Sequence, residues 1–227
     1  MKLACLYSGG KDSNYAIYLA SKKHKISCLI SLVSENPYSY MFQTSGNEHI
    51  IKQSEALEIP LIIQKTKGIK EEELKDLKKA IKIAIDPYKI EGIISGAIQS
   101  AYQSSRIQKI CNELNIECFN PLWQIKEEEF LDKLIEDKFE IILVGIFSYP
   151  FTKEYLGQIF NYEFKEKLIQ LHEKYKISLA GEGGEYETFV INSPLFKKKL
   201  NILESEKIEE SLNSGILNIK KIELLKK

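Results

Sequence analysis

The sequence has 227 residues, of which 44% are hydrophobic and 28% charged, and its 32 basic and 32 acidic residues give a formal net charge of zero. This composition is ordinary for a globular protein. A protein that grips nucleic acid through phosphates is more often basic, so we expect no nucleic-acid partner. No stretch reaches the roughly 18–20 apolar residues that span a bilayer. Lys11 and Asp12 interrupt any signal peptide, so we expect a cytoplasmic protein without a membrane partner.

Short apolar runs alternate with helical patterns along the first two-thirds of the chain. The runs typical of strands lie at 2–7, 26–33, 61–66, 91–97, 116–119 and 140–147. The helical patterns lie at 13–23, 47–58, 70–85, 100–114 and 127–137. This alternation predicts βαβ units with right-handed crossovers, which build a doubly wound, mostly parallel sheet of the α/β class. The strand runs are apolar almost throughout, as expected for strands covered on both faces.

Two segments break this alternation. Residues 34–46 are rich in Ser, Asn, Pro and aromatic residues and follow a strand, where such folds place binding loops. Residues 177–227 begin with an acidic, glycine-rich stretch and end in charged and apolar runs. We therefore predict two domains, with the doubly wound sheet in residues 1–120 and a smaller α+β module in residues 121–227. The sequence does not indicate an oligomeric state.

The tryptophan and the cysteines point to the core rather than to a ligand. Trp123 is the only tryptophan, and a lone tryptophan is more often a core residue. The four cysteines include no C-x-x-C pair, so we expect reduced thiols without a zinc or iron–sulfur site.

The turn after the first strand reads SGGKDS. Its two glycines permit positive φ angles and leave no side chain between the backbone and a ligand. The helix that follows begins with free N–H groups and a partial positive charge, so strand, turn and helix form an anion site. The candidate binding residues are Ser8, Gly9, Gly10, Lys11, Asp12 and Ser13. The carboxylate of Asp12 would repel a phosphate unless it caps the helix or acts through a metal.

Two commoner nucleotide motifs do not fit this turn. Both G-x-x-x-x-G-K-[ST] and G-x-G-x-x-G separate their glycines, whereas the two glycines here are adjacent. A tight strand–helix turn capped by Ser or Asp is the alternative that involves no ligand.

The fourth strand run leads into another candidate segment. Ser95 and Gly96 end the run, and Gly96 would let the backbone approach a nucleotide closely. Ser100 is expected to cap the next helix. Gln103 and Arg106 are three residues apart and so share one helix face, where Arg106 can hold a phosphate or carboxylate with two hydrogen bonds. A solvated helix with an ordinary arginine is the alternative.

The stretch GEGGEYET at 181–188 concentrates three carboxylates, Glu182, Glu185 and Glu187, among three glycines. Clustered carboxylates repel one another unless they are exposed, bind a metal or face a cation. The stretch is therefore a candidate binding segment, with a solvated acidic loop as the alternative.

The S-G-G-x-D-S turn after a first strand resembles the pyrophosphate loop of the adenine nucleotide alpha hydrolase superfamily, whose members cleave ATP between the α and β phosphates. The resemblance implies a Rossmann-like sheet and a loop, residues 8–13, that wraps the β,γ-pyrophosphate while AMP passes to a substrate oxygen. It also implies ATP and Mg²⁺ as cofactors, with Asp12 as a candidate Mg²⁺ ligand. The superfamily includes tRNA-modifying enzymes and amide-forming synthetases, so this turn does not choose the substrate.

Further stretches together resemble one family, diphthine–ammonia ligase, also called diphthamide synthetase. They are SGGKDS, SENPYSYMFQT, GAIQSAYQSSRI, NPLW, GEGGEYETFV and SPLF. The resemblance implies amidation of diphthine, a modified histidine of translation elongation factor 2. ATP would convert the diphthine carboxylate to an acyl-adenylate, pyrophosphate would leave, and ammonia would attack the acyl carbon to give the amide and AMP. We see no glutaminase module, so free ammonium is the expected nitrogen donor.

This resemblance assigns candidate roles to the residues of the motifs. The catalytic candidates are Asp12, Arg106, Glu182 and Glu185. The nucleotide-binding candidates are residues 8–13 with Ser95 and Gly96. The substrate-binding candidates are Tyr40, Tyr102, Gln103, Gly183, Gly184, Tyr186, Glu187 and Thr188. The acids and Tyr186 would attract the quaternary ammonium of diphthine by Coulomb and cation–π forces, or hold ammonium and help to deprotonate it; the sequence leaves both roles open.

Three other functions compete with this one. A tRNA-modifying ATP pyrophosphatase is opposed by the zero net charge, the lack of a C-x-x-C pair and the acidic 181–188 segment, which would repel phosphates. An amide ligase acting on a small carboxylic acid shares all of the ATP chemistry and stays open. A nucleotide sensor without catalysis would need the glycine turn but not the acidic segment.

Overall fold

The computed structural model describes residues 1–34, 47–69 and 71–227. The chain divides into two compact units: the first spans residues 1–8 and 12–123, and the second spans residues 9–11 and 124–227. Tyr40 lies outside the described residues, so its role in substrate binding stays a prediction.

The first unit is built on a five-stranded sheet in the order β3-β2-β1-β4-β5, and every neighbouring pair is parallel. Its strands are β1 (Lys2–Leu6), β2 (Lys25–Ser34), β3 (Leu61–Thr66), β4 (Gly92–Ile94) and β5 (Glu117–Phe119). The helices between them are α1 (Lys11–Ser21), α2 (Asn47–Leu57), α3 (Glu73–Tyr88) and α4 (Ala101–Glu113). The predicted α/β class and parallel sheet are therefore confirmed. The strand order reverses between β1 and β4, and folds of this type bind ligands beyond the carboxyl ends of such strands.

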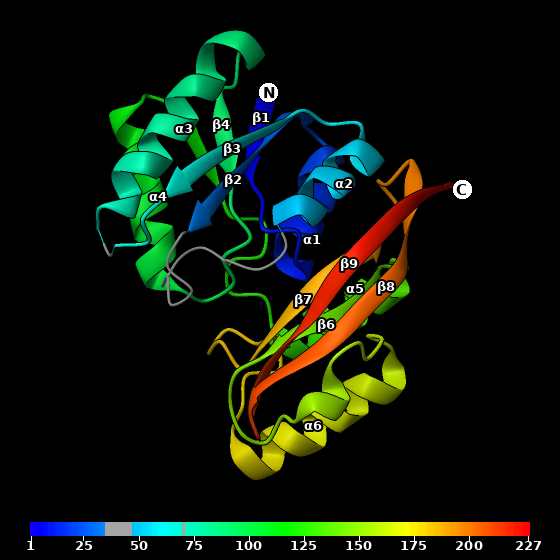
Figure 1. Ribbon diagram of the computed structural model, residues 1–227. Helices are drawn as coiled ribbons and strands as arrows, with labels where there is room; N and C mark the ends of the chain where they lie inside the picture. The colour runs from blue at the N-terminus through cyan, green and yellow to red at the C-terminus, as the bar shows by residue number, and fades with distance from the viewer. Residues whose placement is uncertain (35–46, 70) are drawn as a thin grey trace. The chain divides into compact units, whose positions relative to one another are not determined.

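Helices α3 and α4 pack on the same face of this sheet. Leu77 and Ile81 of α3 and Ile107 of α4 belong to one buried cluster with side chains of β1, β2 and β4. Figure 1 draws α3 and α4 on one side of the sheet and α1 and α2 on the other. Removal of this apolar surface from water is the main force that holds the layers together.

The four cysteines are free thiols, and three of them are buried. Burial raises the pKa of Cys28 to about 12, so this thiol stays protonated and unreactive at neutral pH. The three buried thiols lie in the core of the first unit, as the sequence predicts.

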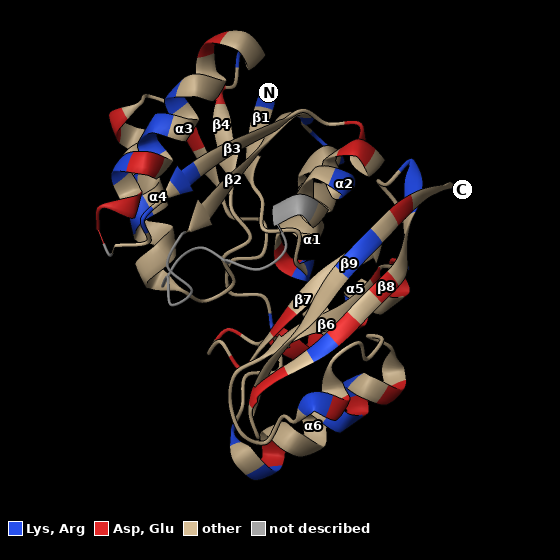
Figure 2. Ribbon diagram, in the orientation of Figure 1, with Lys and Arg blue, Asp and Glu red and all other residues tan. Residues whose placement is uncertain are grey.

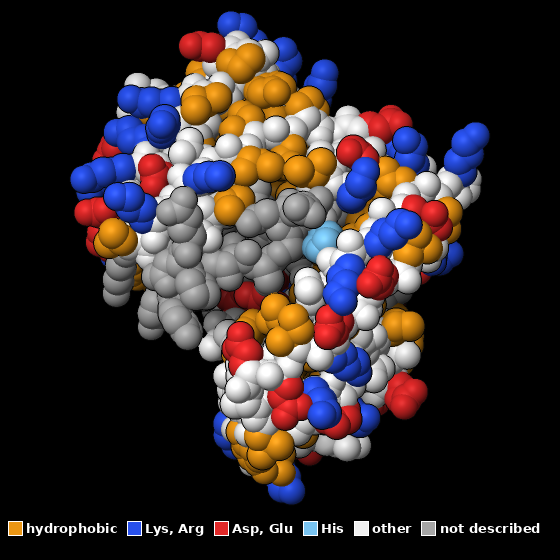
Figure 3. Space-filling model, viewed as in Figure 1, with side chains coloured by type: hydrophobic (Ala, Val, Ile, Leu, Met, Phe, Trp, Pro, Cys, Tyr) orange, Lys and Arg blue, Asp and Glu red, His pale blue; other side chains and the backbone are white. Residues whose placement is uncertain are grey.

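The lysines of the first unit gather locally although the net charge is zero. A hollow of about 410 Å³ at the end of β3 is lined by Lys65, Thr66, Lys67, Glu72, Lys75 and Asp76. Figure 2 places basic residues on α3 and at the tip of β3, and Figure 3 shows them on the surface of this flank. Two carboxylates offset the lysines, so the hollow is not a strong anion site.

The second unit is built on a four-stranded antiparallel sheet in the order β7-β6-β9-β8. Its strands are β6 (Glu140–Ile146), β7 (Tyr186–Asn192), β8 (Lys198–Ser211) and β9 (Ser214–Lys226), and its helices are α5 (Glu127–Glu136), α6 (Tyr162–Tyr175) and the 3-10 turn η1 (Lys153–Tyr155). Run 140–147 forms β6, which pairs with β7 and β9 from the end of the chain and so lies in this smaller sheet rather than in the parallel one. An apolar run has the same sequence pattern in either sheet.

None of the helices in the described ranges combines the length and the apolar composition needed to cross a bilayer.

Leu77 tests the core of the first unit. Its side chain is fully buried in the cluster on α3. Replacing it by alanine removes buried methyl groups and leaves a cavity, which typically costs about 2–5 kcal/mol of stability. We expect Leu77→Ala to lower the urea midpoint of unfolding of the first unit clearly. Ile83→Ala on the same helix is the control, because Ile83 is 47% exposed and its loss should leave the midpoint almost unchanged.

Candidate active site

The turn after β1 is closed by its own serines. The backbone N–H and the hydroxyl of Ser8 lie 3.4 and 3.3 Å from Oγ of Ser13. Gly9 has a φ of 82°, a conformation that favours glycine. Helix α1 starts at Lys11, directly after the glycines, so its N-terminal N–H groups follow the carboxyl end of β1. This is the strand–turn–helix arrangement that binds anions.

Gly96 brings the end of β4 against the start of α1. A Cβ added at Gly96 would lie 2.9 Å from both the carbonyl carbon of Asp12 and the backbone nitrogen of Ser13. Ser95 holds this segment, because its N–H donates to the carbonyl of Phe119 at 2.9 Å and its hydroxyl accepts from the N–H of Ala97 at 3.2 Å. The structure therefore brings four of the nucleotide-binding candidates together, while their role in binding stays a prediction.

Residues 9–11 of the turn belong to the second unit. The N–H of Val190 donates to the carbonyl of Gly9 at 3.1 Å, and the N–H of Lys11 donates to Oγ1 of Thr188 at 3.1 Å. The buried ammonium of Lys11 donates to the carbonyl of Ala180 at 2.5 Å. It also lies 5.5 Å from the ring centre of Tyr186. This side chain thus holds the residues around the acidic segment, and its contact with a phosphate stays a prediction.

The acidic segment is held by carboxylates. Glu127 of α5 accepts hydrogen bonds from the hydroxyl of Ser178 at 2.8 Å and from the N–H of Leu179 at 2.7 Å. Glu185 accepts from the N–H of Ser178 at 2.7 Å. Two of the acids in this region therefore fasten the chain around Ser178, a role that requires no metal. Sequence reasoning missed Glu127, and its only signal was an acidic residue at the start of a predicted helix.

The other residues of the segment differ in exposure. Glu182 is exposed and Glu187 is half-buried. The ring of Tyr186 is buried, and its hydroxyl donates to the carbonyl of Leu179 at 2.5 Å. Gly184 has a φ of 79°, and a Cβ at Gly183 would lie 2.7 Å from Oε1 of Glu185. The glycines therefore let the chain turn sharply and let a carboxylate lie against the backbone.

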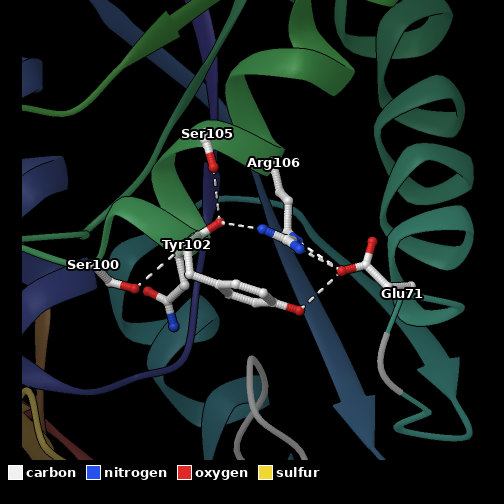
Figure 4. Close-up of polar contacts among 6 residues, drawn as sticks. Glu71, Ser100, Tyr102, Ser105 and Arg106 are labelled. Carbon is white, nitrogen blue, oxygen red and sulfur yellow. Dashed lines mark hydrogen bonds and ion pairs between the residues drawn. The ribbon is translucent and has the colours of Figure 1, made fainter.

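Helix α4 begins as predicted, since the hydroxyl of Ser100 accepts from the N–H of Gln103 at 3.3 Å. Tyr102 and Arg106 lie in the first two turns of this helix. Both side chains contact Glu71, which lies in the segment that precedes α3, as Figure 4 shows. Sequence reasoning missed Glu71. The expectation that Trp123 lies in the core is wrong: its side chain is 38% exposed, and its neighbour Leu122 is the buried residue.

The described residues contain no group of three or more His, Cys, Asp or Glu side chains that could hold a metal ion. Mg²⁺ in nucleotide sites is commonly held by one or two carboxylates together with the phosphates. Asp12 at the start of α1 fits that minimal set, because it is the carboxylate of the anion-binding turn.

Gly96→Ala tests the close approach of β4 to α1. The new methyl group would press on the peptide between Asp12 and Ser13, and overpacking of this kind costs about 1–3 kcal/mol. We expect the dissociation constant for ATP, measured by calorimetry, to rise about 5- to 150-fold while the circular dichroism spectrum is retained. Unchanged ATP affinity would show that the turn does not depend on this contact.

A second pair of variants tests the hydrogen bond to Lys11. Thr188→Val keeps the shape of the side chain but removes the hydroxyl that accepts from the N–H of Lys11, and Thr188→Ser keeps that acceptor. A lost hydrogen bond of this kind costs about 1–3 kcal/mol. We expect weaker ATP binding for the valine variant and near-normal binding for the serine variant. Equal affinities would contradict a role of this bond in holding the turn.

Comparison with known proteins covers both units. The chain matches the diphthamide synthase N-terminal domain over residues 1–118 and the diphthamide synthase C-terminal domain over residues 126–225. A solved structure described as a predicted subunit of tRNA methyltransferase from Methanocaldococcus jannaschii covers 86% of this chain and 98% of its own, with 19% identity and a TM-score of 0.46, which is too low to bear on function.

Curated relatives give a consistent name. The diphthine–ammonia ligase of Rattus norvegicus is 33% identical over 94% of this chain and 87% of its own length. The human diphthine–ammonia ligase is 32% identical over the same shares. That of Schizosaccharomyces pombe is 31% identical over 93% of this chain but only 38% of its own length. With both of its halves matched and these relatives aligned along nearly all of it, the chain belongs to the diphthamide synthase family.

Proposed function

We propose that this protein is an AMP-forming ligase that amidates diphthine on translation elongation factor 2, with ATP and ammonium as co-substrates. The observation that carries this proposal is the match along nearly the whole chain to relatives named diphthine–ammonia ligase. That name gives diphthine and ammonia as the two groups that are joined. Elongation factor 2 as the carrier of diphthine, and the cytoplasm as the place of the reaction, are parts of the proposal.

The turn after β1 is the candidate site for the leaving group. Departure of pyrophosphate builds negative charge, and preorganised N–H groups at a helix N-terminus stabilise such charge as it develops. The candidate donors are the hydroxyls of Ser8 and Ser13 and the N–H groups of α1 that follow Lys11, whose own N–H donates to Thr188. Gly96 leaves the backbone accessible beside them. The chain is suited to attack of a carboxylate oxygen on the α-phosphorus with loss of pyrophosphate.

Mg²⁺ belongs to the proposal as an ion held mainly by ATP. Asp12 would be its one protein ligand from the described residues. When bound, the ion would neutralise charge on the phosphate oxygens. The protein's own contribution is the fixed N–H and hydroxyl donors around the turn.

The acidic segment is the candidate site for the cationic partners of the reaction. Glu127 and Glu185 already fasten the chain around Ser178, and the buried ring of Tyr186 faces Lys11. Glu182 is exposed and Glu187 is half-buried. We assign them the attraction of the quaternary ammonium of diphthine or of ammonium, by Coulomb forces that fall as salt is added.

The alternative functions are not favoured. A tRNA-modifying enzyme or a small-carboxylate amide ligase would use the same turn. The curated relatives that align with nearly all of this chain carry neither of those names and are called diphthine–ammonia ligase.

The experiment supplies ATP, Mg²⁺, ¹⁵N-ammonium and elongation factor 2 bearing diphthine. We expect AMP and a diphthamide peptide that carries ¹⁵N, both detected by mass spectrometry. Asp12→Ala should abolish AMP formation. Glu182→Gln should raise the KM for the diphthine protein several-fold and leave the KM for ATP unchanged, whereas the exposed Glu173→Gln of α6 is a control that should change neither. AMP formed without ¹⁵N in the peptide would refute the substrate but not the ATP chemistry.

A further inference from the structure

Arg106 is the only arginine in the sequence, and the chain uses lysine for its other 31 basic residues. Arginine and lysine differ in chemistry rather than in charge. The guanidinium group is planar, stacks on aromatic rings and donates pairs of hydrogen bonds, whereas an ammonium is a compact point charge. A single arginine among 31 lysines therefore indicates that position 106 needs the planar geometry of the guanidinium group.

The surroundings of Arg106 use that geometry (Figure 4). Its guanidinium carbon lies 3.5 Å from the ring centre of Tyr102, a stacked cation–π contact. Oε1 of Glu71 accepts hydrogen bonds from Nε of Arg106 at 3.0 Å, from its Nη2, and from the hydroxyl of Tyr102 at 3.2 Å. Nη1 donates to the backbone carbonyl of Tyr102 at 3.4 Å. One carboxylate oxygen therefore fixes both the ring and the guanidinium above it.

This arrangement leaves donors for a ligand. A guanidinium has five N–H groups, and the contacts above use three of them. One N–H on each terminal nitrogen then has no partner in the part of the chain that the structure describes. The side chain is 27% exposed. Two N–H groups on neighbouring nitrogens can bind two oxygens of a carboxylate or a phosphate.

Stability alone does not explain the cluster. An exposed ion pair contributes about 0–1 kcal/mol, and Glu71, with a φ of 68°, adopts a left-handed conformation that is costly for a residue other than glycine. A second ion pair already links α3 to α4, between Lys78 and Glu113 at 2.6 Å. Both pairs join residues 35 positions apart. The Lys78–Glu113 pair, seven residues further along each segment, uses lysine.

The two pairs differ in where they lie along the helices. Glu71 follows β3, and Tyr102 and Arg106 lie in the first two turns of α4, so this cluster is at the carboxyl ends of the parallel strands. Lys78 and Glu113 lie further from that edge. Ligands of such sheets bind beyond the carboxyl ends of the strands. Gly96, five residues before α4, also contacts the start of α1 there.

We propose that Glu71 is a positioning residue, which together with Tyr102 holds Arg106 as the receptor for an anionic oxygen of the reactants. That oxygen belongs either to the acceptor carboxylate or to a phosphate of ATP. The inference rests on the proposed ligase function, since it assigns Arg106 to the substrates of that reaction. Glu71 itself touches no reacting atom in this account.

The first arm of the test reads the geometry directly. Because the chain has one arginine, the ¹⁵N spectrum contains one arginine Nε–H signal, and no assignment is needed. We expect a sharp, slowly exchanging signal in the wild-type protein and in Glu113→Ala. Glu71→Ala should lose the signal to exchange with water. Glu71→Asp, which keeps a carboxylate and tolerates a positive φ better, should keep part of it.

The second arm reads the consequence for binding. Loss of a fixed, charge-assisted contact costs about 1.5–3 kcal/mol, which corresponds to about 10- to 150-fold in kcat/KM. We expect this loss in Glu71→Ala and in Arg106→Lys, a partial loss in Glu71→Asp, and none in Glu113→Ala, with thermal midpoints nearly unchanged. A rise in the KM for ATP would assign the oxygen to a phosphate, and a rise in the KM for the diphthine protein would assign it to the acceptor.

Two results would overturn the inference. One is a kcat/KM of Glu71→Ala equal to that of Glu113→Ala for both substrates. The other is an Nε–H signal that survives in Glu71→Ala. If the wild-type protein makes no ¹⁵N-amide, the proposed function fails, and titrations of the wild type with ATP and with acetate, as phosphate and carboxylate probes, then decide. An Nε–H shift with either probe would support Arg106 as an anion receptor, and no shift with either probe would refute it.

Discussion

The first unit depends on one close backbone approach, that of Gly96 to the peptide between Asp12 and Ser13. β1 and β4 are neighbours in the parallel sheet, so the segments that follow these two strands leave the sheet at the same edge. With no side chain at Gly96, the segment after β4 can lie against the first turn of α1. The anion-binding turn, the Ser95–Gly96 segment and the start of α4 are therefore brought to one edge of the sheet, where a nucleotide and its acceptor can meet.

The second unit holds several carboxylates in and around a short segment, where like charges repel one another. Glu127 and Glu185 are used as acceptors for N–H and hydroxyl groups around Ser178, which compensates their charge with fixed dipoles. The buried ammonium of Lys11 supplies a positive charge beside the same residues. Glu182 stays exposed and is one of the two acids that we assign to a cationic partner. The acidic segment is thus partly scaffold and partly candidate binding surface.

The sequence predicts the elements well where periodicity decides them and poorly where distant partners do. The strands β1 to β5 and the helices α1 to α5 follow from apolar runs and 3.6-residue spacing, with shifts of a few residues at their ends. The direction of β6 depends on pairing with β7 and β9 and could not be predicted from its own residues. Glu71 and Glu127 were missed because their partners lie 35 and 51 residues away. The sequence contains a single arginine, and this rarity already indicated that Arg106 has a special role.

The central claim is that the turn after β1 supports transfer of AMP to a carboxylate oxygen. Diphthine labelled with ¹⁸O in its carboxylate, on elongation factor 2, tests this most directly. If an acyl-adenylate forms and ammonia displaces AMP, one labelled oxygen must appear in the phosphate of AMP. Label found instead in orthophosphate or pyrophosphate, or AMP that carries no label although the amide is made, would contradict the account.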